Sequence, residues 1–230
     1  LANQYLEDTA YLKYRATIAS QLSEYYLANN DFEKLYRLID TYLELAGARD
    51  EGAPLLLFNS GMTRLSRHEI DELIADFTRY EQLYGNTSSR VVIQYFLGLG
   101  YLLDQEHATS LTYLDLVIND GNSKFKPDAE FRKALALMGL DRIDEAGAHI
   151  ESFIARYPKS PLRPTAELTL GGLVELLGDS RQALIHYHRV AELTEDAGLI
   201  GSAEVKIAGI FAYQRKADDA IVRLQSYLDD

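Results

Sequence analysis

Small residues and pairs of large apolar residues recur along the chain with a long, regular spacing. A small residue returns every 36 to 38 positions, and a large apolar pair follows it sixteen and nineteen positions later. Because residues three apart lie on one face of a helix, each large pair marks the buried face of a second helix. The pattern predicts an all-α array of antiparallel helix pairs, with the small residues where helices cross most closely. These small residues are Ser23, Gly61, Gly98, Ala134, Gly171 and Ala208.

The other columns of the repeat support the same helix pairs. Another column lies twelve positions after the small residue of each unit. It holds Leu35 and Leu73 in the first two units and a small residue in the last four, from Ser110 to Ala220. Short polar residues or glycine, as in Gly178-Asp179-Ser180, suit a helix end followed by an N-cap. The large apolar pairs are Ile39 with Tyr42, Phe77 with Tyr80, Leu114 with Val117, Ile150 with Phe153, Tyr187 with Val190, and Leu224 with Tyr227.

These columns resemble the tetratricopeptide repeat, most closely over residues 164–197. Leu170-Gly171 stands at the family's leucine-glycine pair and Val174 at its first-helix anchor. The turn, the alanine position and the two second-helix anchors are held by Gly178-Asp179, Ala183, Tyr187 and Val190. The resemblance implies a right-handed superhelical solenoid of stacked antiparallel helix pairs. We predict one array over residues 1–230, with residues 1–15 forming a partial preceding helix. The predicted units span residues 16–49, 54–87, 91–124, 127–160, 164–197 and 201–230.

The segment Tyr157-Pro158-Lys159-Ser160-Pro161 resembles a loop of bacterial tetratricopeptide proteins of the cell envelope, such as outer-membrane assembly lipoproteins and cell-division coordinators. This resemblance implies a periplasmic or envelope-associated protein. Because the chain starts at Leu1 and shows no signal segment, we expect a mature form or a part of a longer protein.

Composition narrows the classes of partner and chemistry. The chain has 35 acidic and 23 basic residues, a net charge of -12, so it would repel a nucleic-acid backbone. Acidic residues gather where second helices are expected to begin, which suits helix capping. The chain contains no cysteine, and its apolar runs are too short to span a bilayer. We therefore expect no nucleic-acid partner and no membrane insertion of this segment.

The sequence shows no pattern of convergent catalytic or metal-binding residues. His186 and His188 are two positions apart, so on a helix they point to different faces and cannot share a metal ion. Neither a His-Glu-x-x-His motif nor a nucleophile elbow occurs. We expect no enzymatic activity, no cofactor and no metal.

The resemblance implies that the first helix of each unit lines a concave groove. An apolar and aromatic stripe is expected there, suited to an amphipathic helix or an extended apolar peptide. The alternative is that these side chains pack against the next unit as core. The expected function is a protein or peptide interaction scaffold; a ligand- or glycan-sensing region of an envelope protein and a self-assembly module are the alternatives. The stripe comprises Phe58, Met62, Tyr95, Leu99, Leu102, Phe131, Leu135, Met138, Leu168 and Tyr213.

Overall fold

The described part of the chain is entirely helical. The computed structural model describes Leu6 and residues 14–46, 50, 52–85, 87–121, 123–214 and 217–229, and these ranges form helices α2 to α13 and contain no strand. The chain divides into two compact units, residues 1–117 and 118–230.

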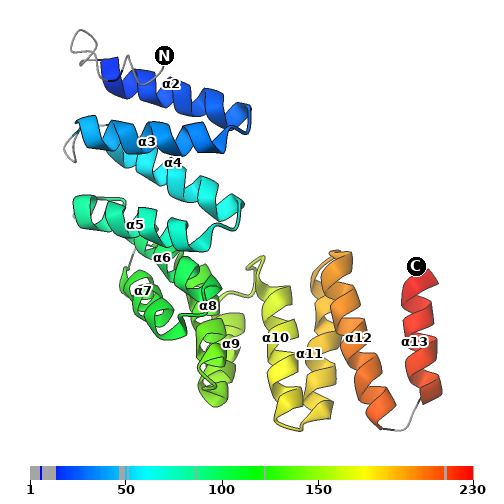
Figure 1. Ribbon diagram of the computed structural model, residues 1–230. Helices are drawn as coiled ribbons and strands as arrows, with labels where there is room; N and C mark the ends of the chain where they lie inside the picture. The colour runs from blue at the N-terminus through cyan, green and yellow to red at the C-terminus, as the bar shows by residue number, and fades with distance from the viewer. Residues whose placement is uncertain are drawn as a thin grey trace. The chain divides into compact units, whose positions relative to one another are not determined.

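In the first unit, consecutive helices from α2 to α6 pack on one another along the chain (Figure 1). Helix α6 packs on α7 through the stacked rings of Tyr101 and Tyr113, whose centroids are 5.6 Å apart. Helix α2 packs against both α3 and α4, so the first helix of one pair also contacts the first helix of the next pair. Helix α7 continues to Asn119, just past the last residue of this unit. The helices are α2 (Arg15–Ala28), α3 (Phe32–Ala46), α4 (Ala53–Ser66), α5 (Ile70–Tyr84), α6 (Arg90–Leu103) and α7 (His107–Asn119).

The second unit repeats this arrangement. Consecutive helices pack against one another from α8 to α13, and α10 also contacts α12. The prediction of an all-α array of antiparallel helix pairs is confirmed in each unit, whereas the division into six repeats stays a prediction. The helices are α8 (Lys126–Gly139), α9 (Ile143–Arg156), α10 (Arg163–Leu176), α11 (Ser180–Leu193), α12 (Ala197–Tyr213) and α13 (Ala217–Asp229).

Small residues stand where the two helices of a pair approach most closely. A Cβ atom on Gly171 would lie 2.6 Å from Cε1 of Tyr187, the large residue sixteen positions later. The same holds for Gly61, whose Cβ would lie 2.7 Å from Cζ of Phe77. Since real Cβ atoms do not come this close to a neighbour, the large ring occupies space that only a glycine leaves open.

The turns inside the first five helix pairs share one backbone feature. Each contains one residue with a positive φ, between 55° and 91°, seven positions after the small residue. At Gly178, the next residue, Asp179, donates its amide to the Val174 carbonyl, as in a Schellman C-cap, and its side chain accepts from the Gln182 amide at 3.0 Å. The predicted helix end and N-cap are therefore confirmed here. The residues with positive φ are Asn30, His68, Gln105, Asp141 and Gly178.

The partial helix predicted over residues 1–15 falls largely outside the described residues. Leu6 is helical and fully buried in the core cluster of the first unit, and Arg15 begins α2.

Candidate functional site

The predicted stripe of the first unit lies mainly in contact with the core. Tyr95 and Leu99 are buried, with 6% and 9% of their surface exposed. Phe58 and Met62 are half-buried and pack against the core cluster; the Phe58 ring lies 5.8 Å from that of Phe77. Leu102 is half-buried. The burial of Tyr95 and Leu99 is compatible with the core alternative, and the assignment of the stripe to a partner-binding groove stays a prediction.

The stripe residues of the second unit differ widely in exposure. Phe131 is buried at 5% exposure, whereas Tyr213 is 89% exposed. Leu135, Met138 and Leu168 are half-buried, and Leu168 packs against the core cluster around Tyr187. The stripe therefore does not present a uniform apolar surface within this unit. Its role in binding remains a prediction.

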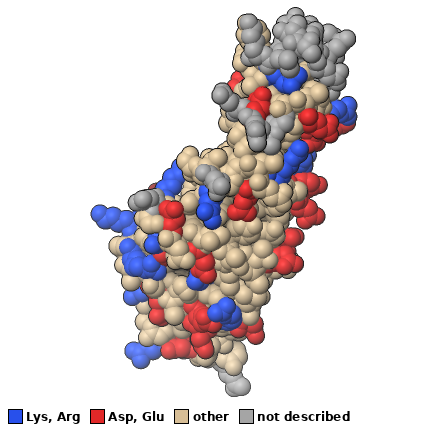
Figure 2. All heavy atoms as spheres, turned by 90° about the vertical axis from the view of Figure 1, so that its left-hand side faces the viewer, with Lys and Arg blue, Asp and Glu red and all other residues tan. Residues whose placement is uncertain are grey.

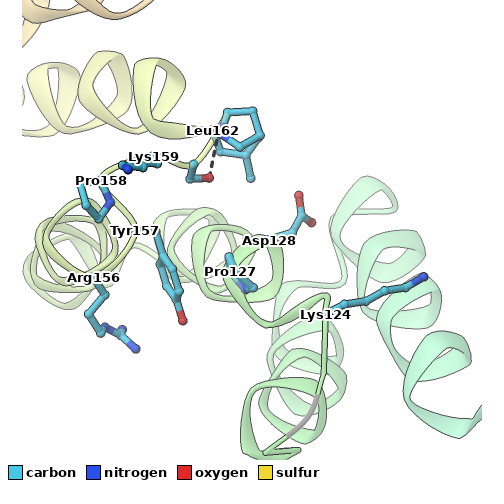
Figure 3. Close-up of a pocket in the computed structure, with 10 residues that line it drawn as sticks. Lys124, Pro127, Asp128, Arg156, Tyr157, Pro158, Lys159 and Leu162 are labelled. Atoms are coloured by element: carbon cyan, nitrogen blue, oxygen red, sulfur yellow. Dashed lines mark hydrogen bonds between the residues drawn. The ribbon is translucent and has the colours of Figure 1, made fainter.

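An open cavity of about 600 Å³ lies at a different place in the second unit, where two connections between helix pairs meet. One wall comes from the start of α8 and the residues before it, and the other from the end of α9 and the connection to α10 (Figure 3). The volume falls in the range of about 300–1,000 Å³ that is typical of ligand pockets. Its lining residues are Lys124, Pro127, Asp128, Arg156, Tyr157, Pro158, Lys159, Ser160, Pro161 and Leu162.

The connection between α9 and α10 is held in place by several hydrogen bonds. The Ser160 amide donates to the Tyr157 carbonyl at 3.0 Å, and the Ser160 Oγ accepts from the Leu162 amide at 3.2 Å. A guanidinium nitrogen of Arg163 donates to the Pro158 carbonyl at 3.0 Å. Proline fixes φ at two of these positions, so little conformational entropy remains to be lost on binding. This wall of the cavity is preformed.

A buried carboxylate anchors the same wall. Glu130 of α8 is buried and receives hydrogen bonds from Arg156 at 2.6 Å and from the Tyr157 hydroxyl at 3.2 Å. Burial, with the negative charge of Glu130, raises the pKa of the Tyr157 hydroxyl, which keeps it protonated as a donor. The Tyr157 ring also packs on Phe153, with ring centroids 5.4 Å apart. Tyr157 is thus fixed with one ring surface available to line the cavity.

One column of the repeat, which was not predicted from the sequence, holds glutamine or glutamate, and its members Glu130 and Glu167 are buried carboxylates. Glu167 is fully buried and lies 2.7 Å from Nδ1 of His186, and Glu204 accepts from Arg223 of α13 at 2.7 Å. His188, two positions from His186, is exposed, so the two histidines do not face a common point. A signal for the column exists, since Gln or Glu stands four positions before the small residue in four successive units. Those residues are Gln94, Glu130, Glu167 and Glu204.

Acidic and basic side chains both occur on the surface of the described residues. Figure 2 shows acidic and basic side chains interspersed over one face of the molecule. Within the described residues, no three His, Cys, Asp or Glu side chains come together in a way that could hold a metal ion. None of the described helices combines the length and the apolar character that crossing a membrane requires.

Comparison with known proteins confirms the resemblance to tetratricopeptide repeat proteins. The tetratricopeptide repeat family model matches residues 128–160, which contain most of α8, all of α9 and most of the connection that lines the cavity. The columns of the sequence resemble the family most closely over residues 164–197, the helix pair that follows. No curated protein matches the sequence.

Solved structures share the fold at low sequence identity. PilW, a type IV pilus biogenesis factor, has a TM-score of 0.67 at 17% identity, covering 92% of this chain and 92% of that chain. MamA from Desulfovibrio magneticus RS-1 has a TM-score of 0.65 at 17% identity, covering 77% of this chain and 94% of that chain. YrrB, described as a TPR protein with an unusual peptide-binding site, has a TM-score of 0.61 at 17% identity, covering 81% and 90%. These likenesses establish a tetratricopeptide-like helical repeat fold.

Proposed function

We propose that this protein is a non-catalytic interaction scaffold that holds a segment of a protein partner in the cavity between α8 and the α9–α10 connection. The observation that carries the proposal is the preformed, proline-lined cavity of about 600 Å³ on a helical repeat fold. Helical repeat arrays stack rigid elements and expose long surfaces, which suits binding rather than chemistry. The peptide-binding site described for YrrB supports the same class of function.

The chemistry of the cavity favours a peptide over a charged small molecule. Most of its exposed lining is apolar and comes from Pro127, Pro158, Pro161, Tyr157 and Leu162. Proline and tyrosine rings offer flat apolar surface with little rotamer entropy to lose, which is typical of sites that take extended segments. An apolar or aromatic side chain of the partner is expected to enter the cavity.

The envelope remains the expected setting of the scaffold. The support is the loop resemblance over residues 157–161 together with the shared fold of PilW, which is described as a pilus biogenesis factor. This part of the proposal predicts a partner in the cell envelope.

A peptide-display selection tests the site. The wild-type protein is expected to enrich peptides with a large apolar residue, and Pro161→Trp is expected to abolish that enrichment because an indole at this exposed position obstructs the cavity. Leu176→Trp is the matched control, since it adds the same ring at an exposed position of α10 outside the cavity. Circular dichroism checks that both variants fold.

The same selection tests whether the partner binds instead to the predicted stripe on the first helices. If Tyr213→Ser abolished enrichment while Pro161→Trp left it unchanged, the partner would occupy the stripe on the first helices and the cavity assignment would be wrong. Tyr213 is suited to this comparison because its side chain is 89% exposed and its loss leaves no cavity in the core.

A further inference from the structure

Only some of the charged side chains that line the cavity form ion pairs. Asp128 pairs with Arg132 on α8, and Arg156 pairs with the buried carboxylate of Glu130 at 2.6 Å. These two members of the lining are thereby neutralised by neighbours. The remaining charges of the lining are those of Lys124 and Lys159.

Lys124 and Lys159 come from different connections and lie on opposite sides of Pro127 in Figure 3. Both side chains are exposed, and neither ammonium forms an ion pair with a carboxylate among the described residues. Lys124 lies over the Phe125 ring at 5.1 Å, an arrangement that leaves its remaining donors free. Two uncompensated positive charges therefore flank an apolar cavity.

A second cavity extends this surface on the other side of the α9–α10 connection. It measures about 370 Å³ and shares Pro158, Lys159, Ser160 and Pro161 with the first cavity. Its far wall adds Arg163, Pro164, Leu193 and Thr194. Lys159 thus stands between the two cavities, and no acidic side chain lines the second one.

We propose that this surface recognises an acidic segment of the protein partner, in which an apolar side chain enters the larger cavity and acidic residues on its two sides contact Lys124 and Lys159. The inference rests on the proposed function and specifies the partner that this site takes. Carboxylates satisfy ammonium groups that the protein itself leaves unpaired, and charge complementarity of this kind sets which partner is accepted.

The net charge of the chain favours the opposite partner at long range. A chain with a net charge of -12 attracts basic segments from a distance. At physiological ionic strength, however, charges more than about 8 Å apart are largely screened, so the nearest groups decide the preference once contact is made. The two lysines at the cavity therefore outweigh the distant acidic residues.

Three synthetic peptides test the inference by fluorescence polarisation. They share a central Leu-Trp pair and carry flanks of glutamate, lysine or serine. The glutamate-flanked peptide is expected to bind most tightly and to lose affinity at high salt. Lys124→Gln and Lys159→Gln are each expected to weaken its binding about fivefold, and the double variant about 25-fold. Lys206→Gln, which changes an exposed lysine of α12 outside both cavities, is the matched control.

The outcomes separate this inference from the proposed function. If the lysine- or serine-flanked peptide bound as tightly as the glutamate-flanked one and Pro161→Trp abolished that binding, the site would be a peptide site without acidic preference and the inference would be wrong. If none of the three peptides bound, the proposed peptide site would itself be overturned. Equal loss of affinity in Lys206→Gln would show a general charge effect and would also contradict the inference.

Discussion

Replacing glycine by alanine is expected to have opposite effects on stability at two neighbouring positions of α10. Gly171 is buried at the crossing with α11, and a Cβ atom there would lie 2.6 Å from Cε1 and 2.8 Å from Cδ1 of Tyr187. At Gly172 the nearest atom to such a Cβ is the Tyr187 hydroxyl oxygen at 3.8 Å, an ordinary contact. We therefore compare Gly171→Ala with Gly172→Ala.

Helix propensity and side-chain packing set the expected change in the free energy of unfolding. Alanine is favoured over glycine inside a helix by about 0.8–1.0 kcal/mol, so Gly172→Ala is expected to raise the free energy of unfolding by about that amount. Gly171→Ala has the same gain but also an overpacking cost of about 1–3 kcal/mol. The ring cannot move away easily, because Tyr187 is 1% exposed and its hydroxyl donates to Glu175 Oε2 at 2.6 Å. We expect the two variants to differ by about 1–3 kcal/mol.

Urea denaturation followed by circular dichroism measures this difference. At about 2–4 °C per kcal/mol for a chain of this length, the thermal midpoints are also expected to separate. In a Tyr187→Val background the penalty of Gly171→Ala is expected to disappear, which a double-mutant cycle reports as a coupling energy. If Gly171→Ala were as stabilising as Gly172→Ala, the account of small residues at the helix crossings would be refuted.

Three further substitutions test the core and its electrostatics by urea denaturation. Leu97→Ala, at a fully buried position, is expected to cost about 2–5 kcal/mol by leaving a cavity, while Leu176→Ala, at a 71% exposed position, is expected to change little; equal costs would contradict the burial. Ser110→Ala removes a buried hydrogen bond to a backbone carbonyl and is expected to cost about 1 kcal/mol, more than the exposed Thr112→Ala; no difference would count against that bond. Burial and a neighbouring carboxylate raise the pKa of Tyr113 to about 12, so between pH 10 and 12 the folded state keeps a proton that the unfolded state loses, and stability falls as pH rises. Tyr113→Phe is expected to make that fall less steep, and an unchanged slope would contradict the raised pKa.

The helix pairs could be predicted from the sequence because their packing is local and periodic. A glycine at one column and a large ring sixteen positions later, as in Gly171 and Tyr187, already imply two antiparallel helices with their closest approach at the glycine. The structure places both residues in the interior, as the pattern indicates.

The candidate site could not be predicted in the same way. Periodicity assigns a residue to a face of its helix, but the neighbours decide how much of it is covered, so Tyr95 is 6% exposed and Tyr213 is 89% exposed. The cavity depends on two connections that come together only in the folded chain. The prolines and Tyr157 were visible in the sequence as turn residues, while their convergence with Pro127 was not.

Amide chemical shifts of the isotope-labelled protein, titrated with the glutamate-flanked peptide, show where on the protein the peptide binds. The largest changes are expected at the cavity, in the amides of Asp128, Lys159, Ser160 and Leu162. If the changes were centred instead on Leu135, Met138 and Leu168 of the first helices, with the cavity amides unmoved, the peptide would not bind in the cavity.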